Sequence, residues 1–220
     1  MNTDGQWDPG KDFAFVSARA TAPTQKFMAI WRASKPVIAQ VHGWCVGGAS
    51  DYALCADLVI ASDDAVIGTP YSRMWGAYLS GMWLYRMSFA KAKWHSLTGE
   101  PLTGREAADV ELINEAVPFE RLEQRVAEVA ATLARIPLSQ LQAQKLIVNQ
   151  AYENMGLAST QTLGGILDGL MRNTPEARAF IDVAGTKGVR AAVERRDGPW
   201  GDYGQAPAER RPDPTHVIEP

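Results

Sequence analysis

Short apolar runs bounded by glycine and polar residues occupy the first half of the chain, and they predict buried strands. Residues 36–41 form one such run, which is rich in β-branched side chains. Three further runs predict strands over residues 58–61, 65–68 and 112–117. The segments between them predict short helices over residues 24–32, 49–56, 80–87 and 89–98, and another around 107–108.

In the second half of the chain, apolar positions repeat only at helical spacing. Pro137 ends the clearest helix, residues 119–135, whose apolar face is formed by Leu122, Val126, Val129, Ala130 and Leu133. The same spacing predicts helices over residues 139–154, 159–170, 174–183 and 187–195. Strands alternating with helices, followed by helices alone, predict an α/β core with a helical C-terminal region.

Neither pattern extends to the two ends of the chain. Residues 1–20 are polar and rich in turn-forming residues, so we expect loop or disorder there. Residues 198–220 are rich in proline, which favours an extended tail. We therefore divide the chain into an α/β core over 1–118, a helical region over 119–197 and a tail over 198–220.

Composition narrows the choice of partners and compartment. The chain has 220 residues, of which 46% are hydrophobic and 21% charged, as expected for one globular domain with its own core. A net charge of −3 gives no electrostatic attraction to nucleic acid or to a membrane surface, and we expect neither partner. No apolar stretch predicts a membrane span or a signal peptide. Two cysteines in apolar segments favour a reducing cytoplasm over a disulfide framework, and three scattered histidines predict no metal site.

The most informative segment is a glycine-rich turn between a predicted strand and a predicted helix. Gly47 and Gly48 end the run that begins at Lys35, and helix-forming residues follow. Glycine lets the backbone approach a ligand closely, and free N–H groups at a helix start can hold a developing oxyanion. Asp51 lies one helical turn further on, within reach of the same space. Without further context, the glycines can equally form a simple turn and Asp51 can simply stabilise the helix dipole.

Residues 35–57 also resemble the enoyl-CoA hydratase/isomerase (crotonase) superfamily, whose pattern here is K-P-V-I-A-x-V-x-G-x-x-x-G-G-G-x-E-L-A-x-x-C-D. The chain follows this pattern closely, with Ala49 in place of the third glycine. Three later blocks, at residues 67–71, 97–108 and 112–118, are similar to the family in the same order. A lone pair of glycines would be weak support, whereas ordered blocks over residues 30–200 are specific.

The resemblance implies a fold and an activity. The fold would be a crotonase-like ββα spiral core with a C-terminal helical trimerisation region, and the protein a homo-oligomer, trimeric or hexameric. The activity would be that of an enoyl-CoA hydratase, a lyase acting on an acyl-CoA thioester, with coenzyme A entering only as part of the substrate and no separate cofactor. The alternatives are an enoyl-CoA isomerase and a non-catalytic relative.

The resemblance also implies roles for five residues. The Gly48 N–H would polarise the thioester carbonyl, and Gly47 would let the substrate approach. Asp51 stands where hydratases carry a catalytic glutamate. Tyr71 replaces their second glutamate, and we expect it to line the acyl pocket rather than move a proton, because a tyrosine of ordinary pKa, about 10, is a poor base. Arg195 matches a lysine that contacts the coenzyme A nucleotide, although Ala192 replaces the stacking phenylalanine beside it.

One part of the family pattern is missing. The motif A-F-x-A-G-x-D, which carries a second oxyanion donor in the family, is echoed only faintly by residues 12–18. We therefore expect this chain to be N-terminally truncated relative to the family. Loss of one oxyanion donor would favour the non-catalytic alternative.

Overall fold

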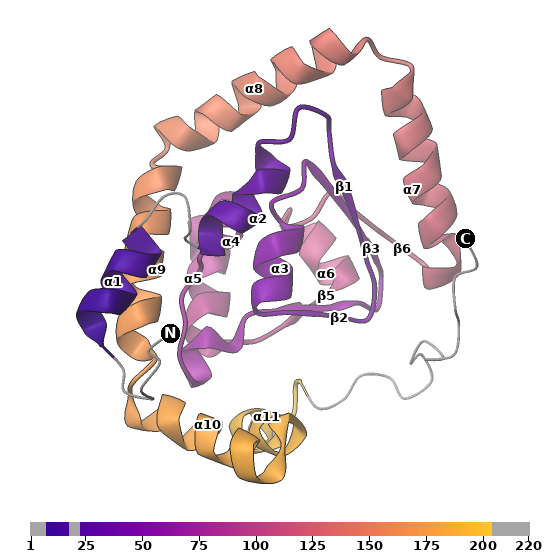
Figure 1. Ribbon diagram of the computed structural model, residues 1–220. Helices are drawn as coiled ribbons and strands as arrows, with labels where there is room; N and C mark the ends of the chain where they lie inside the picture. Colours follow the sequence, from indigo (N-terminus) through magenta and orange to yellow (C-terminus); the bar gives the residue numbers. More distant parts are fainter. Residues whose placement is uncertain (1–7, 18–22, 204–220) are drawn as a thin grey trace.

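The computed structural model describes residues 8–17 and 23–203, and its core is built on two three-stranded sheets (Figure 1). The first sheet is parallel and has the order β1-β3-β6, formed by Ile38–Val41, Leu58–Ser62 and Glu115–Val117. The second has the order β2-β4-β5, formed by Trp44–Val46, Val66–Gly68 and Leu102–Thr103, with β5 antiparallel to β4. Because β1 leads into β2 and β3 leads into β4, the chain passes twice from the first sheet to the second.

A short helix follows the strand that the chain reaches each time it enters the second sheet. After β2 comes the short helix α3 (Gly48–Ala53), and β4 is followed by the 3₁₀ helix η1 (Pro70–Arg73). The remaining core helices are α2 (Pro23–Trp31), α4 (Met82–Tyr85), α5 (Phe89–Thr98) and α6 (Gly104–Asp109). This is the predicted α/β core, so the sequence pattern identified the class correctly.

The C-terminal helices pass around the core rather than through it (Figure 1). They are α7 (Phe119–Ala134), α8 (Leu138–Asn154), α9 (Leu157–Met171), α10 (Pro175–Lys187) and α11 (Val189–Asp197). α7 packs on β1 and β3. α8 has no buried residue at all, which is unusual for a helix of 17 residues.

Apolar side chains from both sheets and the core helices form one continuous core. The largest fully buried members come from α2, the C-cap of α3, α4 and β4, and include Met28, Leu54, Met82, Trp83 and Ile67. Burying such side chains contributes roughly 1.5–3 kcal/mol each. The core therefore fixes α3 and the start of α4 against β4, and these are the elements that carry the candidate site.

Local signals explain where several core elements begin. Thr103 and Glu106 form a capping box at the start of α6, in which Thr103 accepts from the Glu106 N–H and Glu106 accepts from the Thr103 N–H. Ser88 caps α5, and Gly99 ends that helix with φ of 70°. These ends agree with the predicted helix over residues 89–98.

The structure departs from the sequence-based expectations at both ends. Residues 9–17, expected as loop, form helix α1 (Pro9–Ser17), which packs against α9. Residues 198–203, expected as the start of an extended tail, fold back in turns, and Tyr203 is buried. The rest of the expected tail, 204–220, and the N-terminal residues 1–7 lie outside the described part. Strands β2 and β5 were not expected, because three and two residues are too few to show a period.

Within the described ranges, no helix combines the length and the apolar character that a membrane crossing would need.

Candidate functional site

The glycine turn joins β2 to α3 and is held against β4. Gly47 has φ of 62° and ψ of −128°, a conformation that only glycine adopts readily. Its N–H donates to the Gly68 carbonyl at 2.8 Å. Gly48 begins α3, and within the described residues its N–H meets no acceptor. The turn therefore leaves the Gly48 N–H at the helix start available for a ligand oxygen.

Asp51 lies one turn into α3 and is completely buried. Its Oδ1 accepts from the Ser80 hydroxyl at 2.5 Å and from the Ser80 N–H at 3.1 Å. Its Oδ2 accepts from the Tyr71 hydroxyl at 2.9 Å. Burial raises the pKa of Asp51, and these hydrogen bonds lower it to a smaller extent. A buried carboxyl with a raised pKa next to an open backbone donor is a candidate for proton transfer.

Tyr71 connects the carboxylate to the glycine turn. Tyr71 lies in η1, and its hydroxyl donates a hydrogen bond to Asp51. Its ring lies close to the turn, because a Cβ added to Gly47 would be 4.0 Å from it. Burial and the neighbouring Asp51 charge raise the pKa of Tyr71 well above its ordinary value. The phenol is therefore neutral and acts as a hydrogen-bond donor, not as a base.

The structure thus brings Gly47, Gly48, Asp51 and Tyr71 into one place. Arg195 is not part of this group. It lies exposed on α11, at the edge of the molecule in Figure 1, and lines a pocket of about 440 Å³ together with Phe180, Arg196 and Trp200. Ala192, on the same helix, is buried and lines this pocket without an aromatic ring.

Sequence analysis missed Ser80, which makes two of the hydrogen bonds to Asp51. Ser80 is 29 residues away along the chain, and its carbonyl accepts from the Gln161 amide at 2.9 Å. The only signal in the sequence is a serine followed by glycine ahead of an apolar helix, which indicates a helix start and no contact with Asp51. Its position depends on α9 and therefore on tertiary packing.

A second supporting contact holds the helix that carries Asp51. The Ser50 hydroxyl donates to the Gly47 carbonyl at 2.8 Å and accepts from the Trp83 indole N–H at 3.0 Å. Both Ser50 and Trp83 are fully buried. The turn is therefore fastened to α4 as well as to β4.

No trio of His, Cys, Asp or Glu side chains in the described ranges is placed to hold a metal ion.

Comparison with known proteins agrees with this geometry. Residues 15–203 match the family described as enoyl-CoA hydratase/isomerase. The chain belongs to this family. Its fold is similar to a crystal structure of an enoyl-CoA hydratase from Mycobacterium smegmatis, with a TM-score of 0.85 and 37% identity over 95% of this chain and 70% of that one. The expected crotonase-like core is therefore confirmed.

Two curated relatives extend the comparison. A hydroxycinnamoyl-CoA hydratase-lyase of Pseudomonas fluorescens is 28% identical over 130 residues, covering 57% of this chain and 47% of that protein. A probable mitochondrial enoyl-CoA hydratase of Dictyostelium discoideum is 29% identical over 173 residues, covering 76% of this chain and 58% of that protein. The chain thus spans about half the length of these curated relatives.

Proposed function

We propose that this protein is an enoyl-CoA hydratase, which adds water across the double bond of an acyl-CoA thioester. The observation that carries the proposal is the buried Asp51 carboxyl, held by Tyr71 and Ser80 three residues from an open Gly48 N–H. This arrangement supplies a hydrogen-bond donor for the thioester oxygen and a group that moves protons. Family membership supports the reaction class.

Each step of the hydration has a residue to perform it. The thioester carbonyl accepts a hydrogen bond from the Gly48 N–H, which stabilises negative charge as it develops on that oxygen. Asp51, as carboxylate, takes a proton from water while the water oxygen bonds to Cβ of the substrate. The electron pair of the double bond moves to the enolate. The protonated Asp51 then returns the proton to Cα, so one water is added and the enzyme is unchanged.

Tyr71 has a supporting part in this scheme. Its neutral hydroxyl donates to Asp51, and its ring lies beside the glycine turn, where the acyl group would pass. The ring therefore forms a wall of the acyl site, and the hydroxyl fixes the orientation of the carboxylate. Tyr71 cannot replace a second carboxylate as a base, because the pKa of its phenol is raised.

The absence of a second carboxylate at position 71 also favours one alternative, an enoyl-CoA isomerase. Moving a double bond needs a single group that removes a proton from one carbon and returns it to another, and Asp51 alone could do this. A non-catalytic acyl-CoA-binding protein is the other alternative. No separate cofactor is required in any of the three proposals, since coenzyme A is part of the substrate.

Arg195 is proposed to contact a phosphate of coenzyme A. Arg195 is exposed and lines this pocket, whereas the guanidinium of the neighbouring Arg196 is paired with Asp197. Arg195 is therefore the cation placed to meet an anionic nucleotide there. The buried Ala192 offers no ring on which adenine could stack.

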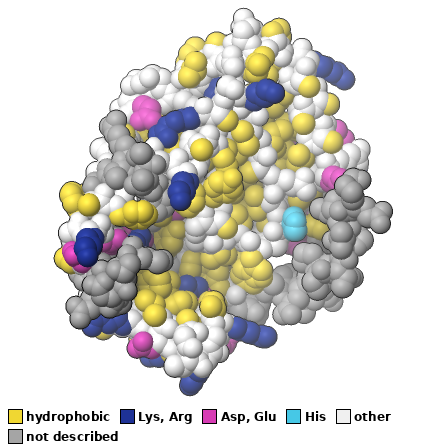
Figure 2. Space-filling view, viewed as in Figure 1, with side chains coloured by type: hydrophobic (Ala, Val, Ile, Leu, Met, Phe, Trp, Pro, Cys, Tyr) yellow, Lys and Arg dark blue, Asp and Glu magenta, His cyan; other side chains and the backbone are white. Residues whose placement is uncertain are grey.

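We also propose that the protein is a homo-oligomer, trimeric or hexameric, of the cytoplasm. Large apolar side chains remain exposed on α8 and α9, among them Leu146, Ile147, Leu163 and Leu170. Figure 2 shows hydrophobic side chains gathered over the centre of one face. Such surface supports association between copies. Cys45 and Cys55 are free and buried, as suits a reducing compartment.

A panel of trans-2-enoyl-CoA thioesters tests the proposed activity. Each is incubated with the full chain, and the product is analysed by mass spectrometry and chromatography. A hydratase yields a product heavier by one water, whereas an isomerase yields a product of unchanged mass and different retention. Binding without any product would support the non-catalytic alternative and overturn the enzyme proposal.

A further inference from the structure

The last described residues return to the candidate site from the far end of the sequence. After α11 ends at Asp197, the chain turns, with the N–H groups of Trp200 and Gly201 donating to the Asp197 carbonyl at 2.9 and 3.0 Å. We call residues 197–203 the C-terminal clasp. It makes two separate connections, one to η1 and one to β4, and each leads to a different part of the site.

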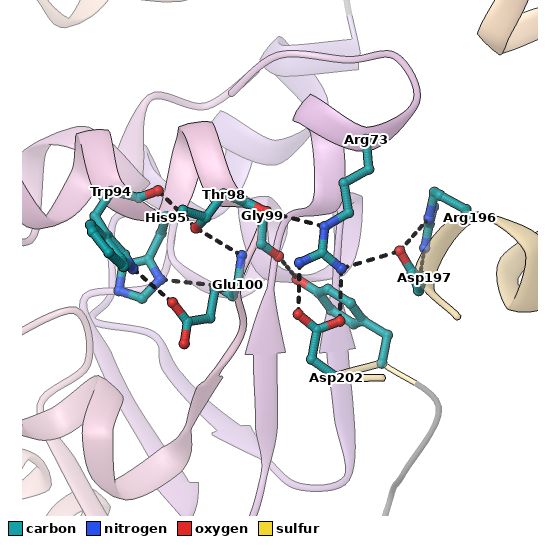
Figure 3. A network of polar contacts seen from close by, with 10 residues as sticks. Arg73, Trp94, His95, Thr98, Gly99, Glu100, Arg196, Asp197 and Asp202 are labelled. Atoms are coloured by element: carbon teal, nitrogen blue, oxygen red, sulfur yellow. Dashed lines mark hydrogen bonds and ion pairs between the residues drawn. The ribbon is translucent and has the colours of Figure 1, made fainter. Parts of the chain in front are cut away.

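The first connection is an ion-pair network around Arg73, the last residue of η1 (Figure 3). The Arg73 side chain is only 3% exposed, and its two terminal nitrogens reach the Asp202 carboxylate at 2.7 and 2.6 Å. Asp197 lies 3.5 Å away on another side, and Arg73 Nε donates to the Thr98 carbonyl at 3.1 Å. A buried guanidinium bonded through all its nitrogens holds the end of η1 in one position.

The Trp200 ring adds a further contact to this network. The Arg73 guanidinium carbon lies 4.4 Å from the centre of that ring. Tyr71 lies two residues before Arg73 in the same four-residue helix. Any displacement of Arg73 therefore moves the backbone that presents the Tyr71 hydroxyl to Asp51.

The second connection is a close contact between Tyr203 and Gly68, the last residue of β4. A Cβ at Gly68 would overlap the Tyr203 hydroxyl and lie 2.8 Å from its Cζ, so only glycine fits beneath this ring. Tyr203 is 6% exposed, and its hydroxyl donates to the Gly99 carbonyl at 2.8 Å. The Gly68 carbonyl in turn accepts from the Gly47 N–H at 2.8 Å. The Tyr203 ring therefore packs directly against Gly68, whose carbonyl accepts the hydrogen bond that holds the glycine turn.

We propose that Arg73 and Tyr203 are positioning residues, through which the C-terminal clasp sets the distance between the Gly48 donor and the Tyr71–Asp51 pair. The proposal rests on the proposed function, because it assigns these residues to the same site. Neither residue touches the reacting atoms. Their effect is on geometry, and a misplacement of about 1 Å at a reacting group can cost about 10²-fold in rate.

The test compares Tyr203→Ala, which removes the ring from Gly68, with Tyr203→Phe, which keeps it. Asp63→Asn is the control, because it breaks an ion pair with the exposed Arg105 elsewhere on the surface. We expect Tyr203→Ala to lower kcat about 10-fold to 100-fold while KM changes by less than about 3-fold. Tyr203→Phe should retain most of the turnover, and Asp63→Asn should match the unmodified protein.

Amide hydrogen exchange gives a readout that does not depend on activity. In Tyr203→Ala, peptides over residues 44–52 and 68–74 should exchange faster. The reason is that the Gly68 carbonyl, which accepts from the Gly47 N–H, is no longer held in place by the ring. The peptide over α7 should be unchanged. If Tyr203→Ala does not fold, Asp202→Asn replaces it, since that change leaves the buried ring in place and should speed exchange over 68–74.

The outcomes separate the two proposals. If the unmodified protein turns over no enoyl-CoA thioester, the proposed function fails, and exchange alone then tests the clasp. Wild-type exchange over both peptides in a folded Tyr203→Ala or Asp202→Asn protein would overturn the positioning role. So would an unchanged kcat in an active protein.

Discussion

At the residue scale, burial disfavours the charged form of Asp51, and the neighbouring hydrogen-bond donors offset this only in part. The side chain is completely buried, and burial outweighs the hydrogen bonds from Ser80 and Tyr71, so the pKa of Asp51 is raised. Buried carboxyls that are retained despite this cost are typical of functional sites. The buried Asp51 carboxyl is therefore expected to lower the stability of the fold while it supports turnover.

Asp51→Asn should separate these two effects. The amide keeps the size of the side chain and can still accept from Ser80, so the fold should be preserved. Without a base, kcat should fall about 10²-fold to 10⁴-fold. Steady-state kinetics on the preferred thioester from the panel measures the fall in kcat. Near-normal turnover would refute the assigned role.

The difference in stability between Asp51→Asn and the unmodified protein should depend on pH in a defined direction. The pKa of Asp51 is raised in the folded protein, so above the ordinary aspartate pKa of about 3.9 the folded state binds more protons than the unfolded state. The Asp51 contribution to the free energy of unfolding is therefore complete below that pH and is lost as pH rises through the folded pKa. Urea unfolding at about pH 4 and about pH 7 should show Asp51→Asn gaining stability relative to the unmodified protein at the higher pH.

Tyr71→Phe should shift the pH profile of activity. The Tyr71 hydroxyl bond lowers the pKa of Asp51, so its removal should raise that pKa further. The acid limb of kcat/KM against pH should then move to higher pH. Tyr52→Phe is the matched control, because Tyr52 lies on α3 next to Asp51 and its side chain is exposed. A limb that stays in place would show that Tyr71 only lines the pocket.

At the element scale, short helices depend on their ends more than on their length. α6 has six residues and begins with the capping box of Thr103 and Glu106. Thr103→Ala removes the hydroxyl that satisfies the Glu106 N–H and should lower the free energy of unfolding by about 0.5–2 kcal/mol. Chemical denaturation measures this, with Thr132→Ala as the control because that hydroxyl only meets a carbonyl within α7. Equal losses in both variants would contradict a capping role.

At the scale of the whole molecule, α8 is the element that the chain alone does not explain. None of its residues is buried, yet Leu146, Ile147 and Val148 are apolar and more than half exposed. If α8 lies at an interface between copies, Leu146→Glu should shift the protein to a smaller assembly in light scattering. Leu97→Glu is the matched control, since Leu97 is 71% exposed and Leu146 is 68% exposed. An unchanged mass for Leu146→Glu would exclude this face from the interface.

Local patterns in the sequence were sufficient for most of the helices and for the centre of the site. The helical spacing of residues 119–135 predicts α7 almost to its ends, because an amphipathic face repeats every turn. Gly47, Gly48 and Asp51 lie within five consecutive residues, so their proximity follows from chain connectivity alone. Short elements such as β2 and β5 could not be predicted, since pairing partners define them.

Tertiary structure decided everything in the site that depends on distant segments. Ser80 reaches Asp51 across 29 residues, and Asp202 reaches Arg73 across 129. No spacing rule joins such pairs, because they meet only when the sheets, α4 and the clasp pack together. The burial that raises the pKa of Asp51 is likewise a property of that packing. The sequence by itself determined the family, the α/β order and the residues around Gly48, whereas the three-dimensional packing determined what holds them in place.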